Sequence, residues 1–246
     1  IIFIQGITEF IPVSSSSHLF LFSNFTNFEE QSLLIDVSLH IGSFLAVLCY
    51  FYTDILDFIK NKILFLKILI SSIPVMLVGF FLVETNLIEN LRNIKVIAWT
   101  TLIFGILLYF SDKRNLGKNI ESNFSFKSAI FIGAFQILSL IPGVSRSGIT
   151  MTAARILNFN RFDSAKISFL LSLPTLGAVS LFGLNKTLSL NNINFSLINI
   201  LCIFLSFLFS ILTIKYFLHF VKKFSLNIFV IYRVLLGIIL LFLSYS

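Results

Sequence analysis

The sequence predicts an all-α polytopic membrane protein built as an inverted-topology repeat, each half a re-entrant helical hairpin plus three transmembrane helices. The first observation is composition: of 246 residues, 57% are apolar and 12% are charged, about half the charged fraction of soluble domains. The second is a set of six apolar stretches of near-spanning length. The third is a pair of shorter apolar stretches, each broken by a proline.

The six long stretches approach the roughly 20 apolar residues that a helix needs to cross the hydrocarbon core. A soluble protein of this composition is excluded, because too little polar sequence remains to cover a buried core. The chain begins at Ile1 inside an apolar run, so we expect its true N-terminus to lie upstream. The approximate bounds of the stretches are 36–52, 63–83, 94–110, 167–183, 196–217 and 226–244.

Two shorter apolar stretches each end at a proline. Residues 1–11 run into Pro12, and residues 128–141 run into Pro142. At 1.5 Å per residue neither reaches across a bilayer, so we expect re-entrant hairpins whose freed backbone groups are satisfied by protein or water. An alternative for the first stretch is a spanning helix cut short by the missing start. The second arms of the hairpins cover about 18–25 and 146–157.

The charged residues between these stretches predict how the chain is oriented. Lysines and arginines gather in three connections, and cytoplasmic segments are enriched in these residues. Glutamates fall in two others, 24–35 and 84–93, which we place outside together with 184–195. On this assignment all six spans alternate in direction. The basic connections are 53–62 with the adjoining start of the next span, 111–127 and 218–224.

The two hairpins resemble each other in sequence. Residues 11–14 (IPVS) correspond to residues 141–145 (IPGVS), with one extra glycine. Each hairpin is followed by three spans, and because three is odd, the second half starts on the opposite side of the membrane. We therefore expect one integral membrane domain, residues 1–246, with repeats at about 1–111 and 127–246. Such repeats usually place their site where the two broken elements meet.

Glu9 and Arg146 are charged residues inside apolar segments. A charge at the bilayer centre costs about 2.5–3.5 kcal/mol, so each needs a partner or water. Gln5 shares a helix face with Glu9, and oxygen ligands at this spacing suit a hard divalent cation, Mg²⁺ or Ca²⁺. The plainer alternative is that Glu9 and Arg146 only pair as a structural contact between the hairpins. We favour a functional site, because intramembrane charges usually have functional roles.

A run of four serines, 14–17, precedes His18. A serine near an imidazole and a carboxylate has the parts of an activated nucleophile. Serines also cap helices well, and that is the better interpretation of any one of them taken alone. The combination with Glu9 on the preceding helix favours chemistry.

Residues 142–150 have the composition of a phosphate cradle. Gly143 and Gly148 let the backbone approach a ligand closely. Ser145 and Ser147 place hydroxyls beside the N–H groups that start a helix, which bind anions. Arg146 adds a planar fork suited to phosphate oxygens. The segment is not a Walker loop, since it lacks the GxxxxGK[ST] pattern.

Other polar residues carry weaker signals. Asp36 and His40 lie four residues apart at the start of a span, where they either support the site or form an interfacial pair. Arg233 lies within the last span, where we expect it to snorkel to the membrane surface or to neutralise a buried acid. His219 lies beside two lysines at a predicted cytoplasmic end, and we assign it no catalytic role.

These segments resemble the bacterial undecaprenyl-diphosphate phosphatases of the bacitracin-resistance type. Residues 5–15 (QGITEFIPVSS) fit the (E/Q)xxxE segment of that family and its PVSS continuation, which ends at His18. Residues 142–150 (PGVSRSGIT) fit its PGxSRSxxT segment. The similarity runs nearly end to end, with supporting stretches at 36–42, 168–174 and 232–237.

The resemblance implies hydrolysis of undecaprenyl diphosphate to undecaprenyl phosphate and inorganic phosphate. This reaction recycles the lipid carrier of peptidoglycan synthesis, supports cell-wall biogenesis and cell shape, and gives resistance to the antibiotic bacitracin. The resemblance also implies a multi-pass protein of the bacterial cytoplasmic (inner) membrane, with its active site open to the extracytoplasmic side.

The resemblance also assigns roles to residues by their position in the two segments. The divalent cation, Mg²⁺ or Ca²⁺, at Glu9 together with Gln5 is expected from the spacing of these two residues. The chain departs from the family pattern at Gln5, where Glu is frequent, and at Ser17, where Gly is usual and positive φ is cheap. The implied catalytic residues are Glu9, Ser15, His18 and Arg146; the implied phosphate-binding residues are Gly143, Ser145, Arg146 and Ser147; Gln5, Ser14 and Thr150 support them.

A different class of function is open from the sequence alone, because inverted repeats with broken helices are also typical of secondary transporters. A lipid-phosphate flippase on the same repeat is a further alternative. The partners that we expect are a polyprenyl diphosphate and membrane lipids, with a homodimer left open. The net charge of +7 is low for a nucleic-acid-binding protein, and the basic residues lie between apolar runs.

Overall fold

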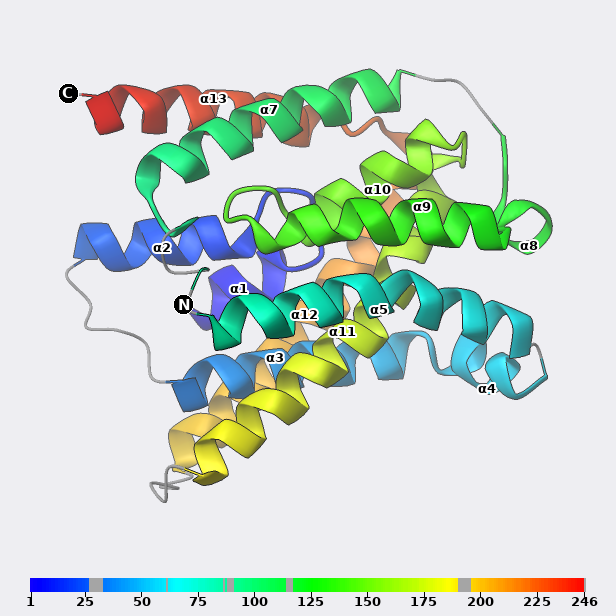
Figure 1. Ribbon diagram of the computed structural model, residues 1–246, viewed down its shortest axis with the longest axis horizontal. Coiled ribbons are helices and arrows are strands. Elements are labelled where there is room, and N and C mark those ends of the chain that lie inside the picture. Colours follow the sequence, from blue (N-terminus) through cyan, green and yellow to red (C-terminus); the bar gives the residue numbers. More distant parts are fainter. Residues whose placement is uncertain are drawn as a thin grey trace.

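The computed structural model describes residues 1–26, 33–60, 62–85, 87, 91–113, 117–189 and 196–245, and nearly all of them lie in helices. Figure 1 shows their arrangement. The elements are α1 (Ile2–Thr8), α2 (Ser15–Thr26), α3 (Leu33–Tyr50), α4 (Tyr52–Lys60), α5 (Lys62–Glu84), α7 (Ile94–Asp112), α8 (Ile120–Asn123), α9 (Phe126–Ile137), the 3₁₀ turn η1 (Leu138–Leu140), α10 (Arg146–Ile156), α11 (Arg161–Ser189), α12 (Leu197–Lys223) and α13 (Asn227–Tyr245).

Five of the described helices are long and apolar enough to cross a membrane: α5, α7, α11, α12 and α13. A sixth candidate is the pair of α3 and α4, which meet at a bend of 74°. These correspond to the six predicted stretches, although α11 begins at Arg161 rather than near residue 167. The chain is therefore a multi-pass helical membrane protein.

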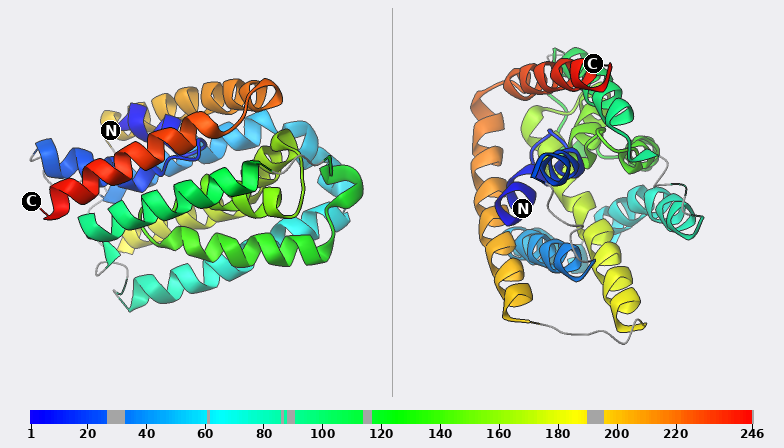
Figure 2. Two further views of the ribbon diagram at one scale, coloured as in Figure 1. Left: turned by 90° about the horizontal axis from the view of Figure 1, so that it is seen from above. Right: turned by 90° about the vertical axis from the view of Figure 1, so that its left-hand side faces the viewer.

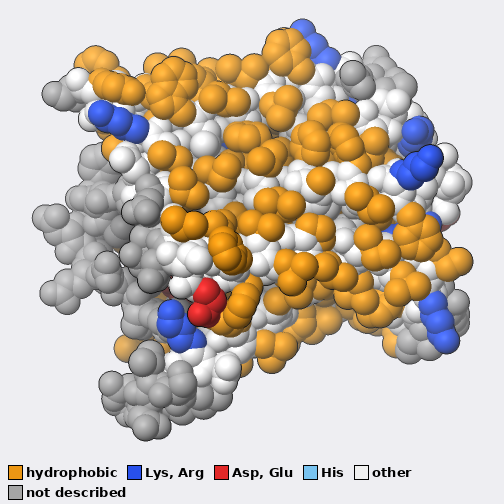
Figure 3. Space-filling model, viewed as in Figure 1, with side chains coloured by type: hydrophobic (Ala, Val, Ile, Leu, Met, Phe, Trp, Pro, Cys, Tyr) orange, Lys and Arg blue, Asp and Glu red, His pale blue; other side chains and the backbone are white. Residues whose placement is uncertain are grey.

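The surface matches that environment. Figure 3 shows hydrophobic side chains over most of one face, while several lysine and arginine side chains lie near the end that carries α4 and α8. Large apolar side chains such as Leu77 (66% exposed) and Phe80 (58% exposed) point outward from α5. Such a surface is stable only in contact with lipid or an apolar partner.

Small residues let the spanning helices approach each other closely. A Cβ on Gly42 of α3 would lie 2.7 Å from Ser206 Cβ of α12, so only glycine fits there. At the next residue of α3, the Ser43 hydroxyl lies 3.0 Å from the Ser210 hydroxyl and 3.2 Å from that of Ser206. Close packing through small residues and interhelical hydrogen bonds is how helices associate in lipid.

Two broken elements lie in the middle of the molecule. The first is α1, a turn at 9–14, and α2; the second is α9, η1, a turn at 141–145, and α10. The views in Figures 1 and 2 place these short helices between the α7–α13 pair on one side and α3, α5 and α11 on the other. The predicted pattern of helix, break and short helix is therefore present at both prolines.

A buried ion network holds the basic end of the fold together. Asp112, at the end of α7, is 2% exposed and pairs with Arg161 at 2.8 Å and with Arg155 at 3.3 Å. Its second oxygen accepts a hydrogen bond from the Leu226 backbone N–H at 3.0 Å. No local pattern predicts this network, because each partner of Asp112 lies more than 40 positions from it.

Candidate active site

The first turn is shaped by the end of α1 and by a strained serine. Helix α1 ends at Thr8, with Glu9 as its C-cap, and Pro12 cannot continue a helix because it lacks an N–H donor. Ser14 has a φ of 74°, a conformation that side chains other than glycine rarely adopt. Its hydroxyl lies 2.8 Å from that of Ser17. The turn reverses the chain so that α2 starts at Ser15, close to Glu9.

The second turn is fixed by backbone contacts. Gly143 has a φ of 93°, and a Cβ there would overlap Thr100 Oγ1 and lie 2.8 Å from Ile97 O, so only glycine fits. Ser145 has a φ of 70° and is the N-cap of α10, where its hydroxyl accepts a hydrogen bond from the Gly148 N–H at 3.1 Å. This capping aligns the first N–H groups of α10, which begins at Arg146.

The Glu9 carboxylate joins the two turns. Glu9 Oε1 accepts a hydrogen bond from Arg146 Nη2 at 2.7 Å. Glu9 Oε2 accepts from the Ser15 hydroxyl and from Gln5 Nε2, each at 3.0 Å. Arg146 Nη1 donates to the Thr175 hydroxyl of α11 at 3.3 Å. Three of the four predicted catalytic residues, Glu9, Ser15 and Arg146, therefore lie together with Gln5.

These side chains open into one small cavity of about 210 Å³. Most of its lining residues are of polar types, and among them Glu9 carries a carboxylate and Arg146 a guanidinium. The side chains of Glu9 and Arg146 are only 8% and 16% exposed, so the pair lies in a setting where electrostatic interactions are stronger than in water. The lining residues are Thr8, Glu9, Ser14, Ser15, His40, Ser139, Ser145, Arg146, Thr175, Leu176 and Val179.

The structure adds residues that sequence reasoning placed weakly or missed. His40 lines the cavity, and its buried Nδ1 has no hydrogen-bond partner within the described part of the chain. Thr175 contacts Arg146 but follows Pro174 in the middle of a long apolar helix, where no sequence signal distinguishes it. Ser139 lies on the 3₁₀ turn just before Pro142.

His18 and Thr150 lie beside the cavity and do not line it. His18 Nδ1 lies 2.7 Å from the Ser14 carbonyl oxygen, and Nε2 is hydrogen-bonded to the Tyr232 hydroxyl. The His18 and Tyr232 rings are also stacked. Both imidazole nitrogens are thus engaged away from Ser15. The Thr150 hydroxyl is fully buried and bonds to Ser168 at 2.7 Å.

Ser147 and Gly143 have structural contacts that the cradle prediction did not anticipate. The Ser147 hydroxyl donates to the Ile11 carbonyl oxygen of the first turn at 2.8 Å. Gly143 packs against α7, and its carbonyl oxygen accepts hydrogen bonds from Arg233 and Thr101. Of the predicted phosphate-binding residues, Ser145 and Arg146 line the cavity, whereas Ser147 and Gly143 connect the surrounding elements.

The expectation for Arg233 is wrong. Arg233 does not snorkel, and it pairs with no acid among the residues that the structure describes; it is fully buried, and its guanidinium donates to carbonyl oxygens of both turns. It bonds to Pro12 O at 3.4 Å, Gly143 O at 2.9 Å and Val144 O at 3.0 Å. Turns with positive φ leave carbonyl groups without helical partners, and the five N–H donors of one arginine satisfy several of them.

The predicted cation has few protein ligands at this site. No group of three or more His, Cys, Asp or Glu side chains within the described residues could hold a metal ion. Glu9 is the carboxylate of the cavity lining, and Arg146 already balances its charge. Gln5 Oε1 is buried and has no hydrogen-bond partner in the described structure. The donor set therefore suits a cation that also takes oxygens from a bound phosphate, as Mg²⁺ sites frequently do.

Comparison with known proteins places the chain in a family. Residues 1–239 match the family model described as "Bacitracin resistance protein BacA". A protein of Pelagibacter ubique (strain HTCC1062) named undecaprenyl-diphosphatase is 49% identical over 244 residues, covering 99% of this chain and 95% of the relative. Proteins of the same name from Jannaschia sp. (strain CCS1) and Roseobacter denitrificans are 38% and 40% identical, each covering 99% of this chain and 96% of the relative.

Proposed function

This chain belongs to the bacitracin resistance protein BacA family, and from that premise we propose that it is an undecaprenyl-diphosphatase. It hydrolyses undecaprenyl diphosphate to undecaprenyl phosphate and inorganic phosphate. The observation that carries the proposal is the contact of Glu9, Ser15 and Arg146 in one cavity formed by both turns. The relatives are named as diphosphatases, so the transporter and flippase alternatives receive no support.

Arg146 binds the terminal phosphoryl group. In the free protein its guanidinium is held by Glu9 and Thr175, which keeps the planar fork aimed into the cavity. A diphosphate carries more negative charge than Glu9, so it replaces Glu9 as the partner of the Arg146 guanidinium and accepts two parallel hydrogen bonds from it. The N–H groups at the start of α10, aligned by the Ser145 cap, add to the binding because helix N-termini favour anions.

The exchange of partners at Arg146 activates Ser15. Once phosphate draws Arg146 away, the Glu9 carboxylate loses its counter-charge and can accept the proton of the Ser15 hydroxyl, which lies 3.0 Å away. Ser15 Oγ then bonds to the terminal phosphorus while the bond from phosphorus to the bridging oxygen breaks. Undecaprenyl phosphate leaves, and water attacks the phosphoserine to release phosphate and restore Ser15. Glu9 passes the serine proton to the departing undecaprenyl phosphate, then takes a proton from the attacking water and returns one to Ser15 Oγ as phosphate leaves.

Positioning and charge stabilisation dominate phosphoryl transfer, so the residues around Glu9, Ser15 and Arg146 act mainly by orientation. Gln5 donates to Glu9 and fixes its rotamer, and Gln5 Oε1 and Glu9 would hold a divalent cation together with diphosphate oxygens. That cation would neutralise charge on the diphosphate. His18 stabilises the first turn, because one of its ring nitrogens is bonded to the Ser14 carbonyl oxygen and the other to the Tyr232 hydroxyl.

The two broken elements are proposed to be re-entrant hairpins of an inverted repeat. Both turns contain a serine with positive φ, Ser14 and Ser145, at corresponding positions of the IPVS and IPGVS segments. Each is followed by three candidate crossings: α3 with α4, α5 and α7 in the first half, and α11, α12 and α13 in the second. Three crossings per half invert the second half relative to the first.

The proposed location is the bacterial cytoplasmic membrane, with the cavity open to the extracytoplasmic side. Cytoplasmic segments are enriched in lysine and arginine, and the junction of α4 with α5, the start of α9 and the end of α12 carry such residues. On α3 the cavity residue His40 lies twelve positions before α4. The catalytic cavity therefore lies away from the basic end.

The direct test is phosphate release from undecaprenyl diphosphate by the purified protein in detergent, with no ion gradient. We expect turnover, and we expect a chelator to reduce it and Mg²⁺ or Ca²⁺ to restore it. Absence of release by folded protein under all of these conditions would contradict the proposal. Full activity in the presence of chelator would show that the reaction needs no cation and would leave the rest of the proposal unchanged.

A further inference from the structure

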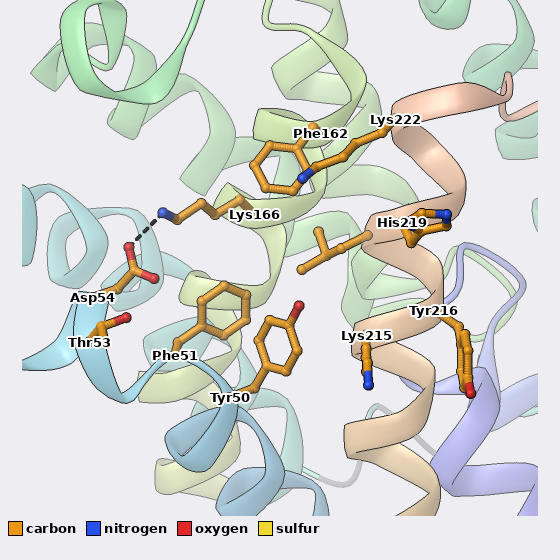
Figure 4. A pocket seen from close by; sticks show the side chains of 11 residues that line it. Tyr50, Phe51, Thr53, Asp54, Phe162, Lys166, Lys215, Tyr216, His219 and Lys222 are labelled. Carbon is orange, nitrogen blue, oxygen red and sulfur yellow. Dashed lines mark ion pairs between the residues drawn. The ribbon is translucent and has the colours of Figure 1, made fainter.

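A second cavity, of about 600 Å³, lies among α3, α4, α11 and α12 (Figure 4). It shares no lining residue with the catalytic cavity. On α3, His40 lines the catalytic cavity and Tyr50 lines this second one. The two residues are ten positions apart, which is about 15 Å along a helix. The lining residues are Tyr50, Phe51, Thr53, Asp54, Phe162, Lys166, Lys215, Tyr216, Leu218, His219 and Lys222.

The lining carries an excess of positive charge. Lys166 is neutralised by Asp54, with 2.6 Å between Lys166 Nζ and Asp54 Oδ1, as Figure 4 shows. Lys222 lies over the Phe162 ring, 4.4 Å from its centroid. Among the described residues, neither Lys215 nor Lys222 has a carboxylate partner. Two ammonium groups are therefore left to bind an anion.

The depth of Lys215 is unusual for a lysine with no acidic partner. It lies inside the candidate span of α12, eight residues before the helix ends at Lys223, which is about 12 Å along the axis. A charge at such depth is costly unless it faces water, a cavity or a partner, and such residues are usually functional. Lys166 lies similarly inside the candidate span of α11.

The other lining residues indicate what kind of anion fits. The Tyr50 and Thr53 hydroxyls and the lysine ammonium groups are donors suited to phosphate oxygens. Phe51, Phe162 and Leu218 add apolar surface, which a bare phosphate ion would not use. The cavity has the size of a pocket for a whole small molecule. A polar head with an apolar continuation matches both kinds of surface.

We propose that this cavity binds the phosphate-bearing headgroup of an anionic membrane lipid. Basic cavities between transmembrane helices at the lysine-rich end of a membrane protein are suited to such headgroups. Binding there bridges α3, α11 and α12, and two of these helices, α3 and α11, also line the catalytic cavity. The site is separate from hydrolysis and does not depend on it.

Native mass spectrometry of the detergent-solubilised full chain tests the proposal, with phosphatidylglycerol and phosphatidylcholine as probes. We expect phosphatidylglycerol to be retained and phosphatidylcholine to be lost. The double variant Lys215→Gln, Lys222→Gln should weaken phosphatidylglycerol binding about twenty-fivefold, because each lysine contributes roughly fivefold. The matched control Lys118→Gln, Lys127→Gln removes the same charge from exposed residues outside the cavity and should bind as the unmodified chain does.

Three results would overturn the proposal: unchanged retention in the double variant, an equal loss in the control, or displacement of the lipid by millimolar inorganic phosphate. The last would assign the cavity to the free anion. If Lys215→Gln fails to fold, Lys222→Gln alone should still weaken binding about fivefold, and Lys215→Arg, which keeps the charge, should bind normally. Loss of binding by Lys215→Arg or normal binding by Lys222→Gln would count against the proposal.

Discussion

The first and second turns have the same outline but differ in what holds them. The second turn is fixed by its backbone: Gly143 fits against α7, Ser145 caps α10, and Arg233 binds two of its carbonyl oxygens. The first turn is also bound at two carbonyl oxygens, by Arg233 and Ser147, but its other contacts are made by the side chains of its own residues Glu9, Ser14 and Ser15. The comparison indicates a division of labour. The rigid turn presents Arg146, and the turn that carries the reacting groups can respond when Arg146 changes partner.

The largest effect is expected at Arg146, the group through which the rigid turn acts. Arg146→Ala should lower kcat/KM about a thousandfold or more, since arginines that stabilise phosphoryl-transfer transition states contribute at least this much. Arg146→Lys should recover only part, because lysine lacks the planar fork. Phosphate release kinetics measure both, with Arg92→Ala, an exposed arginine, as the control. Full activity in Arg146→Lys would show that bidentate geometry is not required.

The second-largest losses of activity are expected at the reacting groups of the first turn, Glu9 and Ser15. Glu9→Gln should lower kcat by about 10² to 10⁴, the usual contribution of a general base, while changing little in side-chain volume. Ser15→Ala should be similarly impaired, and Ser139→Ala, which lines the same cavity, should be nearly normal. Trapping phosphoserine by rapid quench checks the covalent step. Near-normal turnover by Ser15→Ala would leave direct attack by water with Glu9 as base.

Substitutions at the positive-φ positions should change the free energy of unfolding differently in the two turns. Gly143→Ala should destabilise the protein by about 2–4 kcal/mol, because the added Cβ overlaps Thr100 and the positive φ disfavours alanine. Ser14→Gly in the first turn should change stability by less than about 1 kcal/mol, since glycine relieves a strained φ while a serine contact is lost. Thermal unfolding in detergent compares them. Equal losses would contradict the distinction between the turns.

The smallest effect is expected at His18. Because both of its nitrogens are engaged by Ser14 and Tyr232, His18→Gln should lower kcat by less than about tenfold, the size of one or two lost hydrogen bonds. Tyr232→Phe should act in the same direction and no more strongly. Steady-state rates of the two single variants and the double variant measure their coupling. A loss beyond a hundredfold at His18 alone would make it a proton-transfer group.

Much of the site was predictable because its signals are local. A carboxylate four residues after Gln5, a serine run after Pro12 and the SRSG stretch after Pro142 are readable in sequence. The structure brings Glu9, Ser15 and Arg146 together as expected. His40 and Thr175 could not be assigned to the lining, since a lone polar residue on an apolar helix looks the same whether it faces a cavity or a neighbouring helix.

The sequence by itself determined the membrane class, the candidate spans and the two breaks, because apolar length and the missing proline N–H act locally on the backbone. Only the tertiary structure decided which side chains meet. Arg233 bonds to turns about 90 and 220 positions away, and His18 turns toward Tyr232, 214 positions along the chain. Such contacts depend on how the helices cross. The composition of a segment contains no information on the crossing, so the division between a rigid turn and a reacting turn emerged only from the folded chain.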